Sequence, residues 1–255
     1  MSFFKVGDGH ERFVELWPVV VREQLALVVS MRWLRSFIDT ICHSCDVMCM
    51  ELTVIDAARI AGVSPRTVQR AVADGSLGLA RVVGRQSTTD DLAVQAWMRT
   101  TCRGRKWSAR IREAALDLLS GGPGDSITAS ERSRLRGALR GMRARQIASS
   151  AWIGMWARYR SLGEVDLQLI GPSAVDSLSL GMVAGDSWMR FAQADDLGRV
   201  EATQPVLAEP DGDLVVIERA ADDGWARRMV DAYVLGDARE SAAAARQLEA
   251  AAHCL

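Results

Sequence analysis

The stretch of residues 53–75 constrains the fold more than any other part of the chain. Thr53 and Ser64 are residue types that accept backbone hydrogen bonds at helix N-termini. Pro65 suits the first position of the helix that Ser64 would cap. Gly62 and Gly75 can adopt the left-handed backbone conformation with which helices commonly end. The pattern therefore predicts two short helices joined by a tight turn.

The two predicted helices each have an apolar side and a polar side. Apolar residues recur where the helices can pack together: Val54, Ala58, Val63, Val68 and Val72. The second helix has four polar residues facing outward near its N-terminal half: Arg66, Thr67, Gln69 and Arg70. Such side chains contact phosphates and purine edges in a major groove, so we expect this helix to read double-stranded DNA. Because one such helix contacts only a few base pairs, we expect a homodimer on the DNA.

A short hairpin and a third helix are expected next. Residues 79–83 and 87–89 flank a turn, and this hairpin carries Arg81 and Arg85 as further DNA contacts. Asp90 then caps a helix that contains Trp97. This order of elements resembles the winged helix-turn-helix of the excisionase and mercury-resistance-regulator (MerR) type, although the wing has polar residues 86–88 where that family usually has an aromatic or aliphatic residue. The alternative is a helical hairpin packed in a core, with its arginines in solvent.

Charge is distributed unevenly along the chain. Residues 50–148 contain 17 Lys and Arg against 9 Asp and Glu, whereas residues 149–255 contain 9 against 17. A basic middle beside an acidic tail favours a module that binds a polyanion, joined to a second domain. The alternative is that the two domains complement each other electrostatically.

Two amphipathic helices are predicted after the winged segment. Apolar residues recur with helical spacing over residues 106–119, and Thr128 with Glu131 forms a capping box that opens a helix to about Ile147. Four arginines line one arc of the second helix: Arg132, Arg136, Arg140 and Arg143. Such a stripe is a solvated face, a set of DNA phosphate contacts, or a docking surface for the acidic tail or an acidic partner.

The last part of the chain has the pattern of a small α/β domain. Residues 165–170 and 213–218 are predicted strands, with a weaker one at 188–191, and Asp237 is placed to cap a helix over residues 238–251. The sequence thus predicts an α+β fold. It comprises an N-terminal winged helix-turn-helix in residues 50–104, a basic helical connector in residues 105–148 and an acidic C-terminal α/β domain in residues 149–255.

From residue 107 onward the order of elements resembles the AbiEi-like antitoxins of actinobacterial type IV toxin–antitoxin systems. The matching features include the glycine break at 121–124 and the closing segment 230–240, in which Asp231, Asp237 and Arg239 match best. Those antitoxins join a winged helix to a C-terminal domain and are encoded beside a nucleotidyltransferase toxin. The resemblance implies an antitoxin that represses its own operon and counteracts such a toxin. The alternative is an excisionase- or MerR-like transcription regulator whose C-terminal domain senses a ligand or a partner.

Residues 1–49 match none of these patterns. They form either an added helix or a segment upstream of the true start at Met50, and we expect them to be dispensable. Cys42, His43, Cys45 and Cys49 offer soft metal ligands, but structural zinc normally draws its ligands from two separated knuckles, so we expect no metal. Five cysteines, an odd number, favour reduced thiols and a cytoplasmic protein. The apolar runs are too short to cross a membrane.

No catalytic residues are expected. His10 and His43 lie in residues 1–49 and His253 lies beyond the predicted terminal helix, which leaves no Ser/His/Asp or Cys/His set. Glu164 and Asp166 lack the Gly-Ser turn that precedes the metal-binding acids of nucleotidyltransferases, and no glycines have a phosphate-binding spacing after a strand. We therefore expect a protein that is not an enzyme and needs no cofactor.

Overall fold

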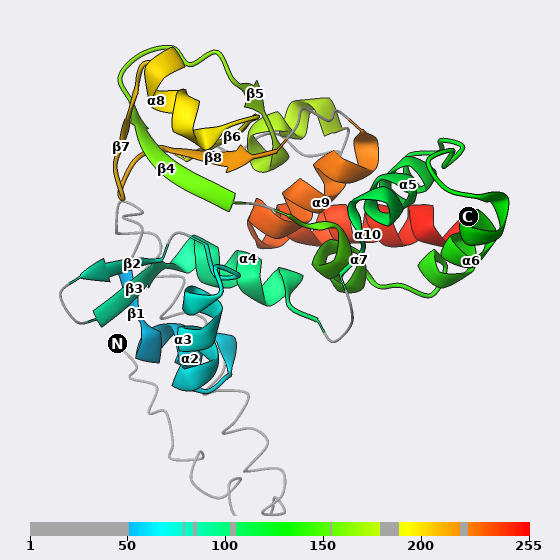
Figure 1. Cartoon of the computed structure of the whole chain (residues 1–255), viewed down its shortest axis with the longest axis horizontal. Coiled ribbons are helices and arrows are strands. Elements are labelled where there is room, and N and C mark those ends of the chain that lie inside the picture. The colour runs from blue at the N-terminus through cyan, green and yellow to red at the C-terminus, as the bar shows by residue number, and fades with distance from the viewer. Residues whose placement is uncertain are drawn as a thin grey trace, which may run out of the picture. The chain divides into compact units, whose positions relative to one another are not determined.

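A computed structural model describes residues 51–78, 80–83, 86–102, 106–153, 155–178, 189–219 and 224–255. Compactness divides the chain into Met1–Met48 and Cys49–Leu255, so all described residues belong to the second unit. That unit mixes helices and strands, which confirms the expected α+β class (Figure 1). Among the described residues no helix combines the length and the apolar character needed to cross a membrane.

The first part of this unit consists of three short strands and three helices. They are β1 (Glu51–Thr53), α2 (Val54–Ala61), α3 (Pro65–Ala73), β2 (Arg81–Val83), β3 (Gln86–Asp90) and α4 (Asp91–Thr100). The strands form an antiparallel sheet in the order β1-β3-β2. A small core joins sheet and helices, and its largest members are Leu52, Val68, Leu77 and Trp97.

The caps expected from the sequence are present. Thr53 Oγ1 accepts a hydrogen bond from Asp56 N at 3.2 Å, and Ser64 Oγ accepts one from Thr67 N at 3.2 Å. Gly62 ends α2 with a φ of 65°, a conformation that side chains with a Cβ adopt only under strain. The turn between the two helices is therefore only three residues long, from Gly62 to Ser64. Val63, expected inside, is 37% exposed because this turn carries it outward.

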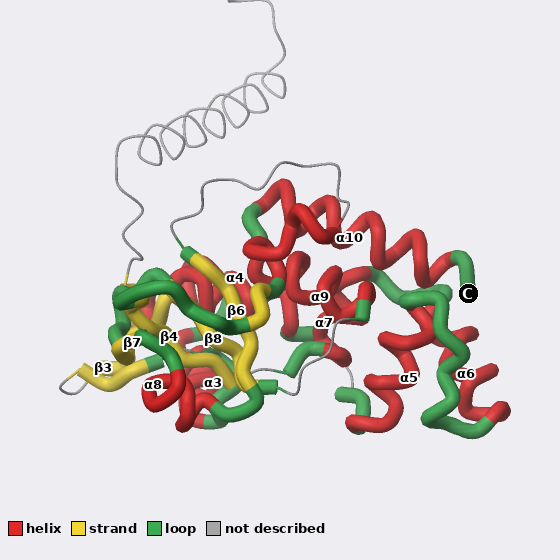
Figure 2. The backbone as a smooth tube through the Cα atoms, turned by 90° about the horizontal axis from the view of Figure 1, so that it is seen from above, coloured by secondary structure: helices red, strands yellow, loops and turns green. Residues whose placement is uncertain are grey.

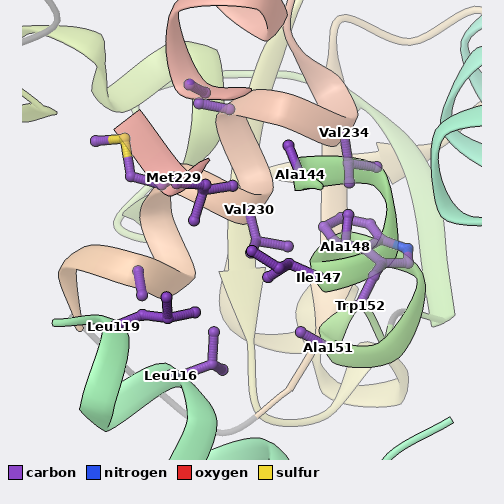
Figure 3. Packing of buried hydrophobic residues seen from close by; sticks show 14 of the residues in the cluster. Leu116, Leu119, Ala144, Ile147, Ala148, Ala151, Trp152, Met229, Val230 and Val234 are labelled. Carbon is purple, nitrogen blue, oxygen red and sulfur yellow. The ribbon is translucent and has the colours of Figure 1, made fainter. Parts of the chain in front are cut away.

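Five helices form the middle of the unit. They are α5 (Ala109–Leu119), α6 (Ala129–Leu139), α7 (Ala144–Ala151), α9 (Trp225–Leu235) and α10 (Ala238–His253). Their apolar faces meet in the largest core, where Val230 of α9 lies beside Ile147 of α7 (Figure 3). Both views place α7, α9 and α10 between the larger sheet and the pair α5 and α6 (Figures 1 and 2).

The single helix expected from Thr128 to about Ile147 is wrong. The capping box of Thr128 and Glu131 does open α6, but that helix ends at Leu139 and the chain turns before α7. The break lets both Leu139 and Ile147 point into the core, where each is fully buried. Helix α7 runs through residue 151 and so crosses the boundary that we placed at residue 148. That division into connector and C-terminal domain stays a prediction.

A five-stranded mixed sheet forms the remaining part. Its strands are β4 (Met155–Ser161), β5 (Gln168–Leu169), β6 (Arg190–Ala194), β7 (Val206–Ala208) and β8 (Leu214–Glu218), in the order β5-β6-β8-β4-β7. Only β6 and β8 run parallel. Central β8 is buried on both faces: Val215 and Ile217 pack against the helical core, and Leu214 and Val216 pack in a second cluster.

Short helical turns complete the sheet region. The second cluster includes Leu197 and Val200 from η2 (Leu197–Arg199) and α8 (Val200–Thr203). The helix α9 contacts η1 (Gly171–Leu178) near the other face. The turn η2 follows β6 and η1 follows β5.

Strand prediction from the sequence was only partly right. The strand at 213–218 is confirmed as β8, and the weaker one at 188–191 corresponds to β6, shifted toward the C-terminus. The strand expected over 165–170 is reduced to Gln168–Leu169, and Glu164 and Asp166 lie before it rather than on it. The sequence analysis missed β1, β4, β7 and α9.

Candidate nucleic-acid interface

Helix α3 carries a polar arc on the side opposite its core contacts. Val68 and Ala71 are buried, whereas Arg66, Gln69 and Arg70 are exposed. At 3.6 residues per turn, positions 66, 69, 70 and 73 share one side of the helix. Ala73 is also exposed, and its side chain is small beside those of Arg66 and Arg70. The structure thus brings together three of the four residues expected on the reading helix.

Thr67, the fourth, has a different position. Its hydroxyl lies 2.8 Å from Ser64 Oγ, so it takes part in the N-terminal cap of α3. Thr67 is half-buried and lines a hollow of about 500 Å³ together with Arg70, Asp74 and Lys106. The structure therefore places Thr67 at the cap and in this hollow, apart from the exposed arc on which it was expected. Arg70 lies at the border between the polar arc and this hollow.

The predicted wing is described only in part. Arg81 begins β2 and pairs with Thr88 of β3, which confirms a two-stranded connection after α3. Arg85 and the neighbouring Gly84 lie outside the described residues. Glu51 of β1 pairs with Asp90 on the other edge of β3, an addition that the sequence analysis missed.

Helix α4 fixes this module to the remainder of the unit at both ends. At its start, Asp90 accepts a hydrogen bond from Leu92 N at 2.7 Å and forms a buried ion pair with Arg158 of β4. At its end, Arg99 donates to the carbonyl oxygens of Val234 and Gly236, at 2.9 and 2.6 Å. The pKa of Arg99 lies below its usual value, mainly because the side chain is withdrawn from solvent. No local pattern could have revealed partners so distant in the chain.

A close contact lies between these two anchors. Trp156 of β4 packs against Gly78, where a Cβ would lie 1.3 Å from the indole Nε1. Trp156 therefore reaches the small core as well as the large one.

The arginine stripe does not lie on one helix, because Arg132 and Arg136 are on α6 whereas Arg140 is its C-cap residue and Arg143 the N-cap residue of α7. Arg132 and Arg136 are half-buried on α6, and Arg132 pairs with Asp125 at 3.2 Å. Arg140 donates to the carbonyl oxygen of Leu255 at 2.5 Å, and Arg143 lies 3.5 Å from Glu249. Of the four, Arg143 thus lies near a carboxylate of α10, and Arg140 contacts the residue two positions after the end of that helix. Which of the three uses the stripe has stays a prediction.

The residues that carry the resemblance to AbiEi-like antitoxins have structural positions. Asp231 is fully buried and forms a two-pronged ion pair with Arg219, with nitrogen–oxygen distances of 2.7 and 2.6 Å. Asp237 caps α10 by accepting hydrogen bonds from Arg239 N and Glu240 N, as expected. Arg239 itself is exposed on the first turn of that helix.

No group of three or more His, Cys, Asp or Glu residues suited to a metal ion occurs in the described ranges. Cys42, His43, Cys45 and Cys49, like His10, lie outside them, and His253 lies on the last turn of α10. No protein-family model, curated protein or solved structure matches the chain.

Proposed function

We propose that the protein binds double-stranded DNA through a winged helix-turn-helix formed by α2, α3, the strands β1–β3 and α4. The observation that carries the proposal is the polar arc of Arg66, Gln69 and Arg70 on a short capped helix that follows a three-residue turn. A helix with this arrangement can enter a major groove while its opposite side stays packed. The basic balance of residues 50–148 supports contact with a polyanion.

Selection of duplexes from a random pool tests this proposal without knowledge of the natural operator. The full chain should enrich a short motif in two copies with regular spacing, since a dimer reads two half-sites. The double variant Arg66→Ala/Gln69→Ala should enrich no motif while retaining its fold by circular dichroism. The exposed variant Arg246→Ala on α10 serves as the control and should select the wild-type motif. A pool without any enriched motif for the wild type would contradict the proposal.

We further propose that the protein represses its own operon and counteracts a partner nucleotidyltransferase. The support is the resemblance of residues from 107 onward to AbiEi-like antitoxins, together with the acidic balance of residues 149–255. An enzyme that grips nucleotide phosphates presents basic surface, which an acidic domain complements. The α/β region, rather than α3, is the part that would oppose the toxin.

Co-expression with the enzyme encoded by the neighbouring gene tests the antitoxin role. Cutting the chain at residue 148 would split α7 and the large core, so full-length variants are the better tools. Arg66→Ala/Gln69→Ala should still rescue growth but lose repression of a reporter carrying the upstream DNA. Failure of the wild type to rescue growth would favour the second candidate, a regulator of the excisionase or MerR type. The hollow beside Arg70 is the observation that favours a ligand-sensing regulator.

A further inference from the structure

Two neighbouring hollows lie beside α3 and share part of their lining, and together they are called the cleft. The first has a volume of about 500 Å³ and the second about 410 Å³. Five of the lining residues are common to both hollows: Asp74, Ser76, Trp97, Thr100 and Lys106. The larger hollow alone is within the usual size of a small-molecule site. The cleft extends from the reading helix to α7 and β4.

Indole rings line the cleft along its length. Trp97 and Trp107 border the larger hollow, and Trp152 and Trp156 border the smaller one. The last two rings meet edge to face, with centroids 6.5 Å apart. Aromatic side chains supply flat apolar surface against which a planar ring can stack. The cleft is therefore suited to a ligand with an aromatic ring.

The charges in the larger hollow favour an anion. Among the described residues its charged lining comprises Arg70, Lys106 and Asp74, two cations against one carboxylate. The smaller hollow adds Glu218, whose carboxylate accepts a hydrogen bond from Leu197 N at 3.2 Å. Asp74 is already engaged, because its Oδ1 accepts a hydrogen bond from Ser76 N at 3.0 Å. Hydrogen bonds from Ser76 lower the pKa of Asp74, with smaller contributions from Arg70 and Lys106. The described charges of the larger hollow thus leave one positive charge unmatched, so the anionic group belongs in this hollow and not in the smaller one beside Glu218.

Arg70 belongs to both surfaces. On a helix, residues 67, 70, 71 and 74 share the side that lines the cleft, and residues 66, 69, 70 and 73 share the side proposed to read DNA. When the Arg70 guanidinium binds an anion in the cleft, it cannot at the same time contact DNA on the other side of the helix. Two ligands that require the same group in different places bind with negative coupling, and the coupling is reciprocal.

We propose that this cleft binds a small anion bearing a planar aromatic ring, and that such a ligand competes with DNA for Arg70. The first half stands on the cleft alone, and the second half rests on the proposed function. Lys106 and Arg70 hold the anionic group, and the half-buried Trp107 supplies the accessible ring beside them, because Trp97 is 8% exposed and packs in the small core. A nucleotide and an aromatic carboxylate share this chemistry.

Tryptophan fluorescence of the full chain, without DNA, tests the first half. AMP and salicylate are the two probes, and adenosine and inorganic phosphate each carry only half of the required chemistry. We expect AMP or salicylate to change the emission saturably. AMP, if it binds, should bind at least about tenfold more tightly than adenosine or inorganic phosphate, because a charge-assisted hydrogen bond and a stacked ring both contribute. Whichever probe binds more tightly identifies the source of the anion.

Variants locate the binding. Lys106→Gln should weaken binding by about tenfold, whereas Arg246→Gln, an exposed change on α10, should leave it unaltered. Alkylation of exposed Cys102, which lines the same hollow, provides a second readout, and bound ligand should slow it. Absence of saturable binding by both probes, or equal weakening by both variants, would overturn the proposal.

Competition with DNA tests the second half separately. The tighter probe at saturation should weaken binding of the selected duplex by the wild type and leave Arg70→Ala unaffected. Ligand binding with unchanged DNA affinity would overturn the competition while leaving the cleft as a binding site. Failure to bind any duplex would refute the proposed function without affecting the fluorescence result.

Discussion

Asp90 and Arg158 form an ion pair that is almost entirely buried and joins two parts of the fold far apart in sequence. The two side chains are 10% and 3% exposed. Asp90 caps α4 with one oxygen and accepts from the Arg158 guanidinium with the other. Arg158 Nε also donates to the carbonyl oxygen of Gly212 at 2.7 Å. These two residues thus join the first part of the unit to the larger sheet at the start of α4.

We expect Arg158→Gln to lower the free energy of unfolding by about 3–5 kcal/mol, because it leaves the Asp90 carboxylate buried without its cation. Urea unfolding measures the loss. Arg160→Gln, two residues along the same strand, is the matched control: its pair with Glu209 is half-exposed, so we expect a loss below about 1 kcal/mol. Similar losses in both variants would show that burial of the Asp90–Arg158 pair has no special energetic role.

Asp90→Asn separates the two functions of this residue. Asparagine is as good an N-cap as aspartate, so the variant retains the cap of α4 and loses only the charge. We expect it to be destabilised nearly as much as Arg158→Gln, whereas the double variant should lose less than the sum. Additive losses in the double-mutant cycle would contradict direct coupling.

Glu131 provides a prediction on pH. Its side chain accepts from Arg110 at 2.7 Å and closes the capping box of α6, and the Arg110 hydrogen bond is the main reason that its pKa falls to about 2. A carboxylate with a lowered folded-state pKa stabilises the fold above its unfolded value and loses this contribution as pH falls. Glutamine can replace the capping hydrogen bond but not the charge.

The stability difference between wild type and Glu131→Gln should therefore be full at pH 7 and shrink as pH falls from about 4.5 toward about 2. Thermal unfolding over this range measures it. Glu113→Gln, an exposed change on α5, is the control for general effects of charge. A difference that stays constant down to pH 2 would contradict the role of the ionised Glu131.

The sequence predicted best where local chemistry decides the structure. Thr53, Ser64 and Asp90 cap the helices that they were expected to cap, and Gly62 turns the chain where expected. Hydrogen bonds to a helix terminus come from residues within three positions, so a short pattern contains all the needed information.

Prediction from the sequence failed where contacts between residues far apart in the chain determine the structure. Strand β4 alternates between Ala157 and Tyr159, which face the second cluster, and Arg158 and Arg160, whose partners lie on β3 and near β7 and β8. The two arginines in a run of only seven residues hide this alternation unless the distant partners are known. The break between α6 and α7 depends on the core that Leu139 and Ile147 share with α9 and α10. Thr67 was assigned to the reading surface because the sequence does not reveal the cleft that it lines.

The polar arc of α3 predicts a graded effect on DNA affinity. Arg70→Ala should weaken binding of the selected duplex by about 1–3 kcal/mol and relax the preference at one base position, as expected for contact with a base edge. Arg85→Ala, at the predicted tip of the wing, should weaken binding about equally for all sequences. Anisotropy titrations with matched and mismatched duplexes measure both. If Arg70→Ala and Arg85→Ala lose the same affinity on matched and mismatched duplexes, Arg70 does not contact a base edge.

The central claim is that α3 and its neighbours bind duplex DNA, and the salt dependence of binding tests it most directly. Affinity of the full chain for the selected duplex, or for the DNA upstream of its own gene, is measured by anisotropy across a series of salt concentrations. We predict that the logarithm of the association constant falls linearly with the logarithm of salt concentration, and that Arg66→Ala makes the slope shallower by about one. Affinity that does not change with salt, or no binding even at low salt, would contradict the claim.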